Sequence, residues 1–272
     1  MRIAIQGEPG SFSHEAAKKF VANGEIVPTP LSAEVFAALA SGAVDAAAIP
    51  IENSLAGSVL EHFDLLLAHN VQIERETLLR IRHNLIALPE ARIDDIERVS
   101  SHPVALAQCR RFFAAHPKMQ PIAFYDTAGS VKQLAESRDP HAAAIASQAA
   151  ARVYGATILE ADIEDNPENF TRFFLVRRRS DAAVDPASNK ISIAFSLENR
   201  PGSLVEALAE LSTLGTNLTK IESRPVHGKP WEYVFYVDCQ IHSAAEGSRA
   251  LEALGPHCAM VKELGRYQEA HR

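Results

Sequence analysis

Cysteine is scarce in this chain of 272 residues. The three cysteines, Cys109, Cys239 and Cys258, are widely separated, and the sequence contains neither a Cys-x-x-Cys pair nor a Cys/His cluster. An odd number of isolated cysteines predicts neither a disulfide framework nor a structural zinc site. We therefore expect a fold stabilised by buried apolar cores, with no metal and no cofactor.

Long apolar runs are also lacking. No stretch is long enough to span a bilayer, and the first residues, 1–5, lead directly into a predicted strand instead of the apolar core of a signal peptide. From these two absences we expect a cytoplasmic protein with no membrane partner.

Basic residues are fewer than acidic ones. The 27 Lys and Arg against 34 Asp and Glu give a formal net charge of −7, whereas nucleic-acid backbones favour basic surfaces. We expect no nucleic-acid partner. An anionic small-molecule substrate would be repelled by the overall charge, so its binding would depend on local hydrogen-bond donors.

Short apolar strands alternate with helical stretches over residues 1–178, which predicts an α/β domain with parallel sheet content. In such sheets ligands bind beyond the carboxyl ends of strands, near helix N-termini. Residues 179–189 are polar and predict a linker. The strand candidates are residues 3–5, 44–49, 84–88, 98–100, 122–124, 143–146 and 173–176.

A different pattern begins at residue 190. Ile191, Ile193, Phe195 and Leu197 alternate with polar or small residues, which is typical of a strand with one buried face. The following segments predict the order βαββαβ over residues 190–272, a ferredoxin-like sheet with both helices on one face. The other face needs covering, and this favours dimerisation through the module.

Four loops in the first domain place small polar residues between a strand and a helix start, which are residues 7–13, 52–54, 101–103 and 126–127. Such loops offer free backbone N–H groups and the positive end of a helix dipole to a carboxylate, although each alone is also an ordinary N-cap. Ser101 and Gln108 are seven residues apart, so a helix beginning at Pro103 would place them on one side. Glu52 is either a general acid or a partner that orients Asn53 and Ser54.

Thr171 and Arg172 precede a predicted buried strand, which would normally open with another apolar residue. A hydroxyl donor beside a cation suggests a pocket that holds an anion and donates a hydrogen bond to a leaving oxygen. Considered alone, such a pair is more often a threonine at a strand edge beside a surface arginine. His62, His69, His83 and His102 have no metal-ligand spacing and are taken as non-catalytic.

Six ordered motifs together resemble prephenate dehydratase with a C-terminal regulatory ACT domain, and they cover essentially the whole chain. The first four are Gly7-x-x-Gly10-Ser11-Phe12-Ser13, residues 50–59, Ser101-His102-Pro103 through Gln108-Cys109, and Asn169-x-Thr171-Arg172-Phe173; the ACT signatures are residues 199–204 and Glu222-Ser223-Arg224-Pro225. We expect the chorismate mutase module that is fused to some relatives to be absent.

The resemblance implies a two-lobed, type 2 periplasmic-binding-protein-like catalytic domain with the active site between the lobes. It implies that Thr171 donates a hydrogen bond to the oxygen leaving prephenate, with Glu52 or water as the proton source. The expected substrate-binding residues are Asn53, Ser54, Ser101, Gln108, Thr127, Arg172 and Phe173.

The resemblance also implies feedback regulation by L-phenylalanine, bound where two chains meet in a homodimer or a dimer of dimers. The expected effector residues are Asn199, Arg200, Pro201, Gly202, Ser203, Leu204, Asn217, Leu218, Glu222, Ser223 and Arg224. Two positions depart from the commoner family pattern: Asp126 adds a negative charge before Thr127, and Ser203 replaces an alanine. Arogenate dehydratase and a noncatalytic amino-acid sensor are the alternative functions.

Overall fold

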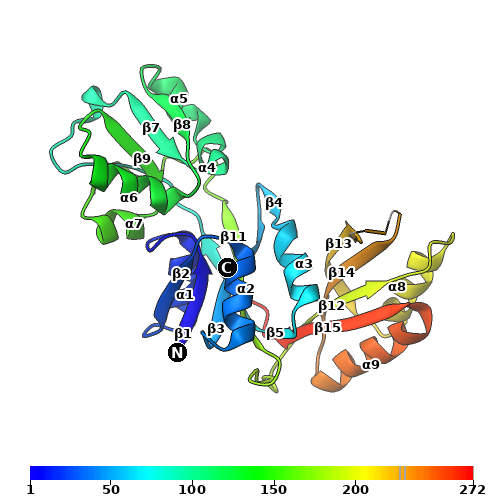
Figure 1. Cartoon of the computed structure of the whole chain (residues 1–272). Coiled ribbons are helices and arrows are strands. Elements are labelled where there is room, and N and C mark those ends of the chain that lie inside the picture. The colour runs from blue at the N-terminus through cyan, green and yellow to red at the C-terminus, as the bar shows by residue number, and fades with distance from the viewer. Residues whose placement is uncertain (227, 230, 272) are drawn as a thin grey trace.

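The computed structural model describes residues 1–226, 228–229 and 231–271. Figure 1 shows two lobes, drawn mainly in blue and in green, and a C-terminal domain in yellow to red beside the first lobe. The chain leaves the first lobe after β5 (Val71–Arg80) and returns to it at β11 (Phe170–Arg178). At this double crossing Ile81 N donates a hydrogen bond to Asn169 O at 2.8 Å, which ties the two connecting segments together.

The first lobe has the strand order β2-β1-β3-β11-β5. The inner strands are buried because helix α1 covers one face of the sheet and α2 and α3 cover the other. The segments predicted near residues 3–5 and 44–49 become β1 and β3. The remaining elements are β1 (Arg2–Gln6), α1 (Phe12–Phe20), β2 (Glu25–Thr29), α2 (Ser32–Ser41), β3 (Ala46–Asn53), β4 (Gly57–Ser58) and α3 (Leu60–Ala68).

The second lobe has the strand order β10-β6-β9-β7-β8, with an apolar cluster on each side of the sheet. Two such lobes joined by two crossings confirm the predicted periplasmic-binding-protein-like architecture. The elements are β6 (Asn84–Ala87), η1 (Ile93–Asp95), β7 (Arg98–Ser101), α4 (Pro103–Ala107), α5 (Arg110–Ala115), β8 (Gln120–Ala123), α6 (Thr127–Ser137), β9 (Ala142–Ala146), α7 (Gln148–Tyr154) and β10 (Thr157–Glu160).

The C-terminal domain has the strand order β13-β14-β12-β15, and α8 and α9 both cover one face, which confirms the ferredoxin-like prediction. Its elements are β12 (Lys190–Ser196), α8 (Ser203–Thr213), β13 (Asn217–Pro225), β14 (Tyr233–Gln240), α9 (Ala244–Leu254), η2 (Gly255–His257) and β15 (Met260–Tyr267). Among the described residues of the chain, no helix has the length and apolar character needed to cross a membrane.

The helix-free face of this domain packs against the first lobe of the same chain. Tyr236 contacts Phe63 of α3 with ring centroids 5.1 Å apart, and Tyr267 contacts Phe174 of β11 at 5.5 Å. These residues belong to one apolar cluster that spans both domains. The expectation that a second chain covers this face was therefore wrong, because the first lobe already buries it.

The sheets of the two domains join where β15 meets β5. Gly265 pairs with Ile73 in parallel, and a β-carbon at residue 265 would lie 2.2 Å from Ile73 O. Only a glycine permits this approach. The result is a continuous sheet that runs from the lobe's β2 to the edge strand β13 of the C-terminal domain.

Candidate active site between the lobes

Neighbouring strands bring two predicted site residues together. β3 and β11 pair antiparallel with Asn53 opposite Thr171. The Asn53 side-chain amide donates to Thr171 Oγ1 at 2.9 Å and to Asn169 Oδ1 at 2.8 Å. Thr171 is 8% exposed, so the hydroxyl lies in a sheltered position.

The contacts of the Asn53 oxygen fix the direction of this hydrogen bond. Asn53 Oδ1 accepts from the backbone N–H groups of Leu55 at 3.0 Å and Ala56 at 2.8 Å, so the NH₂ group must face Thr171. Thr171 Oγ1 is then an acceptor from Asn53, and its own proton is left to donate. Among the described residues the structure shows no acceptor for that proton.

Gln108 extends the network from the second lobe. Its Oε1 accepts from Asn169 Nδ2 at 2.9 Å and from His83 Nε2 at 2.9 Å. Its amide nitrogen then points toward Asn53 Oδ1, at 3.5 Å. Burial lowers the pKa of His83 and so favours the neutral ring, whose Nε2–H is the donor in this contact. Hydrogen bonds between uncharged side chains therefore connect both of the segments that join the two lobes.

These side chains face a cavity of about 430 Å³ between the lobes. Of the predicted catalytic and substrate residues, it contains Asn53, Gln108, Thr127, Thr171 and Phe173. The other lining residues are Gln6, Ser11, Phe12, Ser13, Pro50, Ala56, Gly57, Ser58, Val59, Ile81, His83, His102, Val104, Ala105 and Asp126.

A larger hollow of about 750 Å³ lies between α3 and the strands β13 and β14. It contains Arg224 and Pro225 of the second ACT signature but none of the motif residues of the catalytic domain. We place the candidate active site in the smaller cavity because the network of Asn53, Gln108 and Thr171 converges there.

The cavity includes residues that the sequence analysis set aside or missed. His83 and His102 line it, although their spacing gave no sign of a site. Asp126 also lines it, and its Oδ1 accepts from Gly129 N at 2.7 Å as the N-cap of α6. Burial raises the pKa of this carboxyl. A sequence signal did exist for Asp126, because it is a departure from the family pattern next to Thr127.

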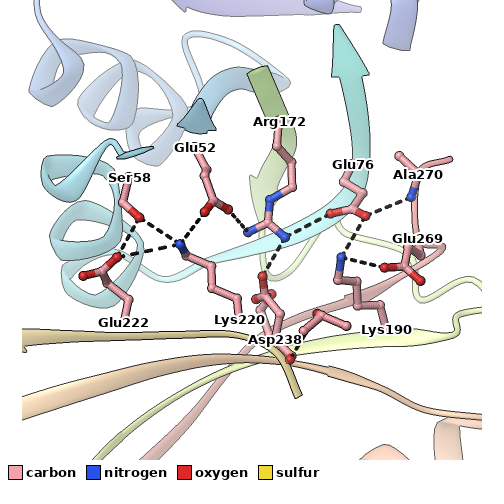
Figure 2. Close-up of polar contacts among 12 residues, drawn as sticks. Glu52, Ser58, Glu76, Arg172, Lys190, Lys220, Glu222, Asp238, Glu269 and Ala270 are labelled. Carbon is pink, nitrogen blue, oxygen red and sulfur yellow. Dashed lines mark hydrogen bonds and ion pairs between the residues drawn. The ribbon is translucent and has the colours of Figure 1, made fainter. Parts of the chain in front are cut away.

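Glu52 and Arg172 do not face the cavity, which corrects their assignment to catalysis and substrate binding. Successive residues of a strand point to opposite faces, so the neighbours of Asn53 and Thr171 point away from the cleft. Figure 2 shows them directed toward the C-terminal domain. Glu52 Oε1 accepts from Lys220 Nζ at 2.9 Å, and Arg172 Nη1 lies 2.6 Å from Asp238 Oδ2.

Ser54 and Ser101 have structural contacts in place of the expected substrate contacts. Ser54 Oγ donates to Glu168 O at 3.0 Å and accepts from Phe170 N at 2.9 Å, which fixes the segment before Thr171. Ser101 is fully buried, and its hydroxyl donates to Ile145 O of β9. Its predicted alignment with Gln108 fails because α4 ends at Ala107, before a second turn forms.

The predicted effector residues fall into separate groups within one chain. Residues 199–204 form the turn beyond the end of β12 and the first two residues of α8, and Gly202 at the N-cap has a φ of 88°. Asn217 lies at the opposite end of the sheet, opposite Gln240. The side chains of Glu222 and Arg224 face the first lobe, where they contact Ser58 and Asp64 respectively.

The described residues contain no group of three or more His, Cys, Asp or Glu side chains that could hold a metal ion. The cavity-lining residues, all of them described, include no Lys or Arg. An anion in this cavity would therefore depend on hydrogen bonds and on the N-termini of α1 and α6, which both begin at its wall.

Comparison with known families supports the resemblance. The prephenate dehydratase family model matches residues 3–181, and the ACT domain model matches residues 191–255. An Arabidopsis thaliana relative named "Arogenate dehydratase/prephenate dehydratase 2, chloroplastic" is 41% identical over 98% of this chain and 72% of its own length.

Two solved structures cover nearly the whole chain. The prephenate dehydratase of Arthrobacter aurescens, described as a complex with L-Phe, has a TM-score of 0.90 and 32% identity over 99% of this chain and 90% of its own. GqqA, described as a novel type of quorum quenching acylase, has the same TM-score and identity over 98% of each chain.

Proposed function

The chain belongs to the prephenate dehydratase family, and from this premise we propose that its interlobe cavity converts prephenate to phenylpyruvate in L-phenylalanine biosynthesis. The reaction is that of a carbon–oxygen lyase. The observation that carries the proposal is the Thr171 hydroxyl, whose proton is free because Asn53 donates to its oxygen. A hydroxyl held in this way can donate to an oxygen leaving the substrate.

In the proposed reaction the ring hydroxyl and the ring carboxylate leave together. The C–C bond to the carboxylate breaks and releases CO₂, its electron pair forms the new ring double bond, and the C–O bond breaks to release hydroxide. Protonation of the hydroxide gives water. The aromatic product supplies most of the driving force, so the protein needs to position the dianion and assist the leaving oxygen.

Thr171 assists that oxygen by donating a hydrogen bond that strengthens as negative charge develops. Asn53 and Gln108 hold the surrounding polar wall, and the first turns of α1 and α6 receive the carboxylates. Phe12 and Phe173 supply apolar surface to the same cavity, which favours loss of the charged carboxylate as neutral CO₂. The leaving hydroxide takes its final proton from water or from a cavity acid such as Asp126.

The direct test is incubation of the purified chain with prephenate, followed by measurement of phenylpyruvate and CO₂. We expect both products in equal amounts, and we expect Thr171→Val to reduce their formation rate strongly. Arogenate supplied in place of prephenate tests the closest alternative, since relatives named for both reactions exist. A larger kcat/KM on arogenate would assign the chain to arogenate dehydration.

An acylase function is a second candidate because GqqA matches the full length of the chain. A threonine nucleophile needs a base to accept its proton. The hydrogen-bond partner of Thr171 Oγ1 in the described residues is the amide of Asn53, which donates and cannot serve as that base. The geometry thus favours the dehydratase, and release of acid from an N-acyl substrate without turnover of prephenate would reverse this choice. Inactivity in both assays would favour the noncatalytic sensor.

L-Phenylalanine is the proposed effector of the C-terminal domain. Residues 199–204 and Asn217 lie at opposite ends of one sheet, so a single site built from both needs two chains, and β13 is the edge strand available for such pairing. We therefore retain the homodimer or dimer of dimers as a proposal. It now rests on the free edge of β13, because the helix-free face of the domain is already covered by the first lobe. Calorimetry with L-phenylalanine, combined with sedimentation of the full chain, tests both parts.

The domain limits 1–178, 179–189 and 190–272 and a cytoplasmic location also stay as proposals. Limited proteolysis tests the limits, because the polar segment 179–189 is the expected site of first cleavage. Equally rapid cleavage outside residues 179–189 would contradict these domain limits.

A further inference from the structure

A buried charge cluster lies on the face of β3 and β11 opposite the cavity, between the first lobe and the C-terminal domain (Figure 2). Its centre is Arg172, whose Nη1 lies 2.6 Å from Asp238 Oδ2 of β14 and 3.5 Å from Glu76 Oε2 of β5. Arg172 is 9% exposed and Asp238 is 4% exposed. Burial favours the neutral form of each group, but the opposite charge outweighs it, so the pKa of Arg172 is raised and that of Asp238 is lowered.

A second bridge from the C-terminal domain reaches the neighbouring strand. Lys220 Nζ of β13 donates to Glu52 Oε1 at 2.9 Å and to Ser58 Oγ at 2.8 Å. Ser58 in turn donates to Glu222 Oε2 at 2.6 Å, and Ser58 also lines the cavity. The bridge thus contacts β3 and β4 next to the site.

The register of β3 and β11 connects this cluster with the reacting groups. Asn53 lies opposite Thr171, and Glu52 lies opposite Arg172. The side chains of Asn53 and Thr171 therefore point toward the cavity. The adjacent residues on the same strands, Glu52 and Arg172, point toward the C-terminal domain. Because neighbouring residues share one backbone, a shift of Glu52 or Arg172 also moves Asn53 or Thr171.

We propose that Asp238 and Lys220, both of the C-terminal domain, are positioning residues for the reaction in the cavity. Through Arg172 and Glu52 they hold β11 and β3 in the register that aligns the Thr171 hydroxyl with the leaving oxygen. This inference rests on the proposed dehydratase function. It also gives the C-terminal domain a physical route to the site, since any change that moves β13 or β14 alters these two contacts without entering the cavity.

The test compares Asp238→Asn and Lys220→Met with a matched control, Glu74→Gln, in the full chain. Asn keeps the shape and the hydrogen-bonding capacity toward Ser192 but removes the charge that faces Arg172. Glu74 pairs with Arg177 at 3.5 Å, so the control removes an ion pair between β5 and β11 that lies near the end of β11 away from Thr171 and involves neither Asp238 nor Lys220.

We expect Asp238→Asn to lower kcat about a hundredfold and Lys220→Met about tenfold, as for small displacements of reacting groups. KM should stay within about threefold, because the groups that bind the substrate are retained. Glu74→Gln should keep kcat within about twofold. Thermal unfolding of each variant identifies an assay temperature at which all of them are folded, so that lost stability does not count as lost kcat.

Folded variants of both Asp238 and Lys220 with wild-type kcat would overturn the inference, even if their unfolding temperatures were lower. If Asp238→Asn does not fold, Lys220→Met decides the question, because Lys220 lies on the edge strand. Equal losses in Glu74→Gln would also overturn it, since any strand ion pair would then have the same effect. An inactive wild-type chain would overturn the proposed function itself, and an active wild type with unaffected variants overturns only the positioning role.

Discussion

Replacement of Thr171 by Val tests the proposed chemistry most sharply, because valine keeps the shape of threonine and removes only the hydroxyl. In the wild-type chain the Asn53 amide donates to Thr171 Oγ1 at 2.9 Å, so the hydroxyl proton is free for the substrate. Loss of one such transition-state donor costs about 2.7–4 kcal/mol, or about 10²–10³ in kcat. KM should change little, because the hydrogen bond strengthens mainly in the transition state.

The same substitution should have a small effect on stability. The Asn53 NH₂ group keeps Asn169 Oδ1 at 2.8 Å and Phe170 O at 3.2 Å as acceptors when the Thr171 oxygen is removed. The expected loss is therefore one net hydrogen bond, about 1 kcal/mol in the free energy of unfolding. This separates the catalytic effect from unfolding by a wide margin.

The assay is the initial rate of phenylpyruvate formation over a range of prephenate concentrations, with urea unfolding of the same samples. Thr171→Ser is the companion variant, because it restores the hydroxyl without the methyl group and should recover much of kcat. A folded Thr171→Val variant with kcat near that of the wild type would refute the donor role. An equally poor Thr171→Ser variant would indicate that packing of the methyl group is what matters.

Three further predictions concern the cavity and its surroundings. Asn53→Ala and Gln108→Ala should each lower kcat/KM by a factor that corresponds to about 1–3 kcal/mol, because each leaves buried polar partners unpaired. Unchanged kinetics in both variants would contradict the proposed role of these two side chains in the cavity. The free energy of unfolding should fall as the pH drops below about 6.5, because burial lowers the pKa of His62 in the folded chain. Between that lowered pKa and pH 6.5 the unfolded chain binds more protons than the folded chain. The stabilisation is therefore present above pH 6.5 and is lost as the pH falls toward the folded pKa. Urea titrations between neutral and acidic pH would measure it, and His62→Asn should reduce the slope. Gly10→Ala should destabilise the approach of the lobes, because Gly10 has a φ of 88° and a β-carbon there would lie 2.6 Å from Ala150 Cα, so a variant with unchanged melting temperature and activity would argue against this contact.

Local patterns in the sequence were sufficient for the architecture. The alternation at residues 190–197 and the order βαββαβ predicted the ferredoxin-like module, in which helices α8 and α9 both cover one face of the sheet. β5 was missed, because charged residues such as Glu74 and Glu76 interrupt its apolar pattern. Those charges pair with Arg177, Arg172 and Lys190 only after distant strands come together.

The sequence by itself identified Asn53, Gln108 and Thr171 as candidate site residues, because their motifs recur in a recognisable order. It could not show toward which face of the sheet the side chains of the neighbouring residues point. Glu52 and Arg172 have the same local signals as the residues beside them, and the direction of each side chain depends on the register of β3 with β11 and on what packs against each face. The tertiary structure decided this: one face of the two strands meets the cavity, and the other meets Lys220 and Asp238 of the C-terminal domain, which are far from β3 and β11 in the sequence. Long-range pairing of this kind leaves no periodicity in the sequence, since it is set by how the lobe and the C-terminal domain pack together.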